Sequence, residues 1–161
     1  SGLTLAISLL VLASTAYWIS SFQIQNLRSK YQHEQLAKIY RQSVERGFRP
    51  DYECHDMQKF ADVFERRIDQ RIILGTMPAD RRMLGVSHLG GKSRDITAVL
   101  FVVKDQPVIV FVDRLSGDLP DAGQTDPNSE LNIFREEKDG LVYCEVTPAA
   151  EPGIIRYFQP D

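Results

Sequence analysis

The chain has 161 residues, of which 43% are apolar and 25% are charged, and its formal net charge is -3. This composition excludes a wholly disordered chain, a collagen-like chain and a membrane protein of many spans. Two cysteines are too few for a disulfide-rich miniature scaffold or a four-cysteine zinc ribbon, and the acidic balance argues against nucleic acid as a partner.

Residues 3–22 form a stretch without a charged residue. Twenty residues of helix extend about 30 Å, which is the thickness of the hydrocarbon core of a bilayer. Tyr17 and Trp18 stand near its end, where aromatic residues favour the membrane interface. We therefore predict a transmembrane helix over residues 1–22, with membrane lipid as its surroundings. The less favoured alternatives are the apolar segment of a signal peptide and a buried core helix.

Residues 23–50 form a basic segment, predicted as a juxtamembrane stalk helix that ends near Gly47 and Pro50. Its apolar residues recur at helical spacing, and they are Ile24, Leu27, Tyr31, Leu36, Ile39, Tyr40 and Val44. This apolar stripe could form a coiled-coil seam or pack against the following domain. The basic residues could contact anionic lipid headgroups, although a solvated helix face is the simpler interpretation.

Residues 51–161 carry 13 basic and 20 acidic residues, a net charge of -7, and we predict one soluble α+β domain there. The helical spacing of apolar residues predicts a helix from Met57 to Ile68, capped by Asp56. Alternating and β-branched runs predict a mainly antiparallel sheet of about five strands. The predicted strands lie at residues 82–86, 96–103, 108–112, 131–135 and 141–146, and a short amphipathic element, either a helix or an edge strand, is expected at 154–158.

The clearest turn signal is Asp139-Gly140, which predicts a hairpin between the last two of these strands. In the second strand of that hairpin, Cys144 shares a face with Val142 and Val146, so we expect its side chain to lie in the core.

Two patterns resemble catalytic or nucleotide-binding motifs without meeting their requirements. Ser87, His88 and Asp95 supply the residue types of a hydrolase triad, but no nucleophile elbow accompanies them. The run from Gly85 through Gly90 and Gly91 to Lys92-Ser93 has one glycine too many for a phosphate-binding loop, and a strand follows it instead of a helix. We therefore predict no catalytic residue, no cofactor and no enzymatic activity.

The sulfur and imidazole side chains offer a further interpretation, as soft ligands for copper or zinc. The residues concerned are Cys54, His55, Met57, His88 and Cys144. No pair of them has the spacing of a metal motif, so a metal- or thiol-handling protein is the least favoured class. Cys54 and Cys144 could instead form a disulfide if the domain faces an oxidising compartment.

The order of these elements behind a membrane span resembles the C-terminal extracytoplasmic domain of bacterial membrane-anchored anti-sigma factors. The segments that carry the resemblance are Met57–Ile68, Met83–Val86, Ala98–Phe101 and Pro107–Val112, within residues 57–113. The resemblance implies a sensor domain outside the membrane and a sigma-factor-binding module upstream of Ser1. It carries no functional residue onto this chain.

The resemblance favours a single-pass protein with an extracytoplasmic domain, although the basic stalk by itself would favour a cytoplasmic one. We expect a regulatory or sensor protein that acts through contacts with a protein partner. The main alternative is a structural or assembly subunit of a membrane complex. Such a subunit would bury Ile24, Leu27, Tyr31, Leu36 and Tyr40 against other subunits.

Overall fold

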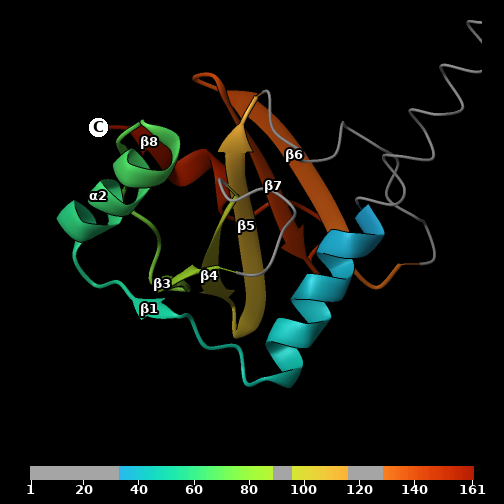
Figure 1. Cartoon of the computed structure of the whole chain (residues 1–161). Helices are drawn as coiled ribbons and strands as arrows, with labels where there is room; N and C mark the ends of the chain where they lie inside the picture. The colour runs from blue at the N-terminus through green and yellow to red at the C-terminus, as the bar shows by residue number, and fades with distance from the viewer. Residues whose placement is uncertain (1–32, 89–95, 116–128) are drawn as a thin grey trace, which may run out of the picture.

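The computed structural model describes residues 33–88, 96–115 and 129–161, and in it one antiparallel sheet lies between two helices (Figure 1). The predicted α+β class with a mainly antiparallel sheet is confirmed. The predicted span of residues 1–22 lies outside the described residues. Among the helices of those described ranges, none combines the length and the hydropathy that a membrane crossing needs.

The main sheet has six strands in the order β1-β3-β4-β5-β7-β6, one more than the five expected, and all neighbours pair antiparallel. A separate two-stranded sheet pairs β2 with β8. The strands of the main sheet are β1 (Tyr52–Glu53), β3 (Arg81–Ser87), β4 (Thr97–Val103), β5 (Gln106–Arg114), β6 (Asn132–Lys138) and β7 (Leu141–Thr147). The smaller sheet contains β2 (Ile72–Leu74) and β8 (Phe158–Pro160).

The predicted strands at 82–86, 96–103, 108–112, 131–135 and 141–146 correspond to β3, β4, β5, β6 and β7. The missed strands β1, β2 and β8 have only two or three residues each, too few for a period-two pattern to stand out. The element expected at 154–158 is a 3-10 helix, η1 (Ile155–Tyr157), that leads into β8. Short elements of this kind depend on tertiary contacts more than on local sequence.

Two tight turns set the register of the sheet. The predicted Asp139-Gly140 hairpin is confirmed, and both residues have positive φ, 54° and 76°. This is the geometry of the two-residue hairpin turns that match the twist of the strands. The β4–β5 hairpin uses the same geometry at Lys104 and Asp105, with φ of 49° and 63°, although neither residue is glycine. A non-glycine residue pays a steric penalty in that region, so this turn is held against local preference.

The helix α2 (Met57–Ile68) begins and ends where the sequence predicts, and the Asp56 carboxylate accepts a hydrogen bond from the Gln58 N–H at 2.8 Å. Its buried face lies on one side of the sheet together with η1 and β8. We call this cluster the α2 core. Its aromatic members are Phe60, Phe64, Phe101, Tyr143 and Phe158.

A second helix, described over residues 33–45, covers the opposite face of the sheet (Figure 1). Leu36, Ala37 and Tyr40 are its buried apolar residues. They pack on sheet residues to form what we call the helix 33–45 core. The buried sheet residues of this core are Ala98, Leu100, Ile109, Phe111, Val142, Cys144 and Val146. The apolar stripe of the 23–50 segment was expected either to form a coiled-coil seam or to pack against the following domain. The part of the segment that the structure describes packs against the domain.

The helix ends at the predicted place through a left-handed cap. Gly47 has a φ of 88°, and the N–H groups of Gly47 and Phe48 donate to the carbonyls of Val44 and Ser43. These are the two hydrogen bonds of a Schellman motif. The Phe48 ring then turns back toward Tyr40, with ring centroids 6.4 Å apart. The cap therefore directs the chain off the helix and along the edge of the sheet.

Candidate functional site

The structure does not bring the two cysteines together. Cys54 belongs to the α2 core and Cys144 to the helix 33–45 core, so the sheet separates them, and both thiols are free. The possible Cys54–Cys144 disulfide is therefore not formed. The expected burial of Cys144 is confirmed, and it shares its face with Val142 and Val146.

Burial also controls the chemistry of these thiols. Desolvation raises the pKa of Cys144 to about 12 and raises the pKa of Cys54 above its usual range. A thiol reacts and binds metals as the thiolate, so neither residue is activated in the folded protein. Among the described residues, no group of three His, Cys, Asp or Glu side chains is placed to hold a metal ion. The metal interpretation gains no support from Cys54, His55, Met57, His88 and Cys144.

Ser87 and His88 both contact Asp51, through different groups of that residue. The buried Ser87 Oγ accepts a hydrogen bond from the Asp51 N–H at 3.0 Å. The His88 imidazole lies near the Asp51 carboxylate, with Nδ1 and Oδ2 3.8 Å apart. Successive strand residues point to opposite faces, which explains why these neighbours do not form a nucleophile–base pair. The third residue of that hypothesis, Asp95, and the loop residues Gly90, Gly91, Lys92 and Ser93 lie outside the described residues.

The segment that joins the two helices runs along the β3 edge, and we call its residues 46–56 the strap. β1 is part of the strap and pairs with β3 through only two residue pairs, Tyr52 with Val86 and Glu53 with Gly85. Asp51 adds two hydrogen bonds, since its N–H donates to Ser87 and its carboxylate accepts from the His88 N–H at 2.7 Å. The strap is thus attached to the sheet at a few defined points.

Gly85 allows this close approach. Its φ is 154°, and a Cβ at this position would overlap the Tyr52 carbonyl oxygen. The register of β3 against β4 shifts between Met83 and Gly85, which marks a β-bulge. A side chain at this position would collide with the strap backbone, so glycine is needed for β1 to pair. In the sequence, Gly85 lies in the predicted strand 82–86 and in the phosphate-loop pattern, and neither prediction gave it this role.

The helix 33–45 is attached to the sheet by one long-range hydrogen bond as well as by apolar contacts. Tyr40 Oη donates to the Pro107 carbonyl at 2.7 Å, at the start of β5. Burial raises the pKa of Tyr40 to about 12, so the hydroxyl remains a donor over the whole physiological range. The contact ties the middle of the helix to the β4–β5 hairpin end of the sheet.

On the α2 side of the sheet, the buried Glu145 carboxylate binds the segment that leads into η1. Glu145 is fully buried in β7, and its two oxygens accept hydrogen bonds from the N–H groups of Gly153, Ile154 and Ile155 at 2.6, 2.9 and 3.1 Å. These bonds hold the start of η1 against the sheet. The sequence signal for this contact was a single acidic residue inside the otherwise apolar run of β7. A charged side chain buried in a strand requires hydrogen-bond partners, so this position could have been predicted to bind backbone N–H groups.

A shallow, open depression lies between the end of α2 and the ends of β5 and β7. Its lining is formed by Ile68, Asp69, Gln70, Arg114, Leu115, Gly140 and Leu141. Its two charged residues, Asp69 and Arg114, have opposite signs, and the surface does not enclose a ligand. We therefore place the candidate functional site at the sheet face covered by helix 33–45 and at the β3 edge that pairs with the strap.

Comparison with protein-family models, curated proteins and solved structures found no match to this chain.

Proposed function

We propose that the chain is a membrane-anchored regulatory or sensor protein that acts through protein contacts, with the organisation of an anti-sigma factor. The observation that carries this proposal is the packing of helix 33–45 on the sheet. The predicted span ends at residue 22, so the helix begins close to it in the chain. A helix that is part of the domain core links the state of the domain to the segment that leads to the membrane.

This link gives a physical route for a signal. A freely jointed tether would transmit neither rotation nor unfolding of the domain, because its conformations are independent of the domain. A packed helix has two distinct arrangements, docked and released, and any event that favours release changes the segment before it. Release would expose the buried residues Leu36, Ala37 and Tyr40 and leave the helix without the support of the sheet, which would make this segment a substrate for proteolysis.

The alternative of a structural or assembly subunit requires the same helix to pack against other proteins. Leu36 and Tyr40 are buried against the chain's own sheet, which leaves them unavailable for a partner while the helix is docked. Ile24, Leu27 and Tyr31 lie outside the described residues, so this alternative stays open for them. We favour the regulatory function because the helix already has an intramolecular partner.

The proposal is tested with a variant that releases the helix in the full-length protein in its native cells. Leu36→Asp places a charge in the helix 33–45 core, whereas Gln42→Asp adds the same charge at an exposed position of the same helix. We expect Leu36→Asp to change the transcript levels of a limited set of genes and Gln42→Asp to leave them unchanged. Unchanged transcripts, together with loss of a membrane complex on native gels, would favour the subunit instead.

The predicted orientation and lack of enzymatic activity have their own tests. A cysteine at the exposed Glu151 should react with a membrane-impermeant maleimide in intact cells if the domain lies outside the membrane. The buried native thiols give a low background in this assay. Labelling only after lysis would place the domain on the inner side.

Turnover in a broad hydrolase and redox screen of the purified protein would contradict the non-enzymatic prediction.

A further inference from the structure

The two edges of the six-stranded sheet differ in length. β1 forms one edge with two residues, beside the β-bulge that ends at Gly85. Short strands and bulges are features by which proteins keep a sheet edge from pairing with another chain. β6 forms the other edge with seven residues, and among the described strands only β7 pairs with it (Figure 1). Its outer side therefore offers an edge long enough to pair with another strand.

The turn at Asp139-Gly140 determines which backbone groups of β6 face outward. Lys138 and Leu141 flank this two-residue turn as a hydrogen-bonded pair, so every second residue of β6, counted back from Lys138, bonds to β7. The backbone N–H and C=O groups of the residues between them point away from β7. These residues are Ile133, Arg135 and Glu137, and their outward groups could bond to an added strand.

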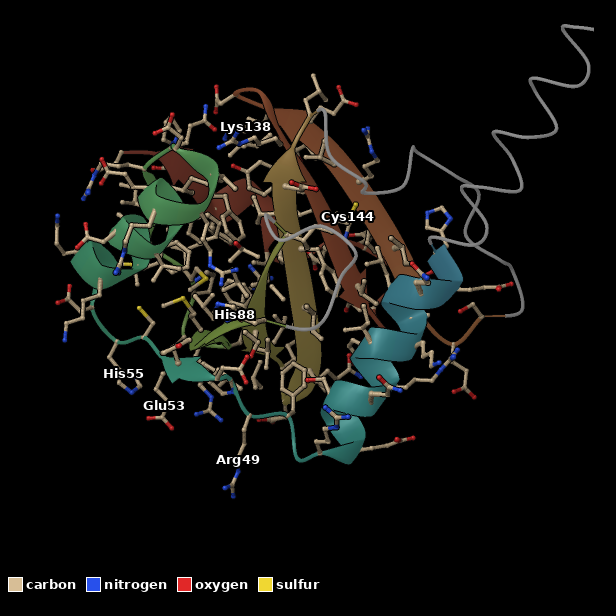
Figure 2. The ribbon with its side chains drawn as sticks, in the orientation of Figure 1. Arg49, Glu53, His55, His88, Lys138 and Cys144 are labelled. Carbon is tan, nitrogen blue, oxygen red and sulfur yellow. The ribbon has the colours of Figure 1, made fainter. Side chains whose placement is uncertain are left out.

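The side chains of this edge alternate between the two faces of the sheet. Arg135 and Glu137 share the face of helix 33–45 with Ile133, and Arg135 Nη1 lies 2.5 Å from Glu137 Oε1. The Arg135 Nε–H is buried and has no acceptor among the residues that the structure describes. Glu136 and Lys138 lie on the α2 side, with Lys138 close to the hairpin turn (Figure 2). The edge therefore carries two cations and two anions in four consecutive residues.

We propose that β6 pairs with β6 of a second copy of this chain, antiparallel and about a two-fold axis at Glu136, so that one sheet continues through both copies. Residues opposite each other in an antiparallel pair lie on the same face. Arg135 of each copy therefore lies opposite Glu137 of the other, and their outward backbone groups exchange two hydrogen bonds. The pairing also brings a second carboxylate to the Arg135 guanidinium.

The charges of β6 favour this register over the two nearest ones that also align the outward backbone groups. A register centred at Arg135 places two arginines opposite each other at the axis, which is unfavourable. A register centred at Phe134 places Arg135 opposite Ile133, so the guanidinium gains no charged partner. The register centred at Glu136 forms two reciprocal ion pairs. Its one like-charged pair, between the two Glu136 side chains, is exposed and has Lys138 of both copies on its diagonals.

The symmetry of this pairing suits two membrane-anchored chains, although the pairing does not depend on the proposed function. A two-fold axis perpendicular to the sheet leaves helix 33–45 of both copies on the same face of the continuous sheet. Both helices therefore lie on one side of the dimer, as two spans that cross one bilayer require. If both proposals hold, pairing of the domains brings two anchored chains together.

Disulfide cross-linking of the full-length protein in intact cells, with the membrane-permeant oxidant diamide, tests the pairing and its register. A strand pair of this length buries less surface than a stable soluble dimer needs, so a covalent trap suits this association. Glu136→Cys places two thiols opposite each other at the axis, in a non-hydrogen-bonded pair whose Cβ atoms are close. We expect about tenfold more linked dimer than for Glu151→Cys, at an exposed position outside the sheet. The native thiols are both buried and add little background.

Charge reversal distinguishes contacts between copies from contacts within one copy. Arg135→Glu and Glu137→Arg, each added to Glu136→Cys, place like charges opposite each other, so each variant alone should give about tenfold less linked dimer. When the two variants are expressed together, their charges are complementary across the pair, and linked heterodimers should return to the level of Glu136→Cys. Co-expression restores no contact within one copy.

Near-ultraviolet circular dichroism of the purified variants checks that each one folds. Glu137 is half-exposed, so Glu137→Arg should fold and tests the ion pairs by itself if Arg135→Glu does not fold. Cross-linking of Glu136→Cys at the level of Glu151→Cys would overturn the proposal. So would full cross-linking in the folded single reversals, or a failure of the two folded variants to recover it together.

Discussion

The two faces of the sheet are covered in different ways. The α2 core contains Cys54 of the strap and residues that follow the strap, with a cluster of aromatic rings around Phe158. Its cover is further fixed by the three hydrogen bonds to Glu145. In the described part of the chain, the helix 33–45 core is covered mainly by that helix, through Leu36, Ala37 and Tyr40 and the hydrogen bond from Tyr40 to Pro107. The α2 side of the sheet is therefore covered by several elements joined by hydrogen bonds, whereas the other side is covered mainly by the segment that follows the predicted span.

Removal of helix 33–45 should have the largest effect on the stability of the domain. A chain that starts at residue 51 leaves Leu100, Ile109 and Phe111 open to water. Burial of two large side chains and of the sheet beneath them contributes about 5 kcal/mol, so we expect loss of cooperative unfolding relative to a chain that starts at residue 33. Urea denaturation followed by near-ultraviolet circular dichroism measures this difference. Equal urea midpoints would show that the helix is dispensable for the fold.

The α2 side is tested at its buried carboxylate. Glu145→Ala leaves three N–H groups without their acceptor, and we expect a loss of about 3 kcal/mol in the free energy of unfolding. Glu145→Gln keeps one acceptor oxygen and replaces the other with an NH2 donor, so part of the hydrogen bonding is retained and the loss should be about half as large. Glu136→Gln, at an exposed position of β6, is the control and should change stability by less than about 0.5 kcal/mol. A neutral effect of Glu145→Ala would mean that water replaces the carboxylate.

The attachment of helix 33–45 is probed more gently by Tyr40→Phe, which removes only the hydrogen bond to Pro107. We expect a loss of about 1 kcal/mol. The folded-state pKa of Tyr40 is raised from 10 to about 12, so the contribution of its neutral hydroxyl is complete below pH 10. It should decline as pH rises from 10 to 12, and the wild type and variant should converge there. A difference that stays constant up to pH 12 would contradict this assignment.

The smallest effect is expected at the β4–β5 turn and should raise stability. Asp105→Gly relieves a residue held at a φ of 63°, and we expect a gain of about 0.5 to 1 kcal/mol in the free energy of unfolding. Thermal unfolding of the purified protein measures it. Gly140→Ala, at a φ of 76° in the equivalent turn, is the reciprocal control and should lower stability by a similar amount. A loss in the Asp105 variant would show that this side chain has a role beyond the turn.

The local patterns of the sequence determined much of this fold. The spacing of Phe60, Phe64 and Ile68 specified α2, and the Asp139-Gly140 turn specified the last hairpin. The alternation around Cys144 specified that its side chain faces the core. These features are readable because helix and strand periodicity is encoded within a few consecutive residues.

The tertiary structure decided which surfaces meet. The apolar stripe of residues 33–45 could have packed against a partner or against the chain's own sheet. Both arrangements need the same helical spacing of apolar residues, so the sequence pattern does not distinguish them. The separation of Cys54 from Cys144, the roles of Gly85 and Glu145, and the attachment of the strap at Asp51 also depend on residues far apart in the chain. The periodicity of a segment shows which of its faces is apolar. Only the folded sheet determines which residues that face packs against.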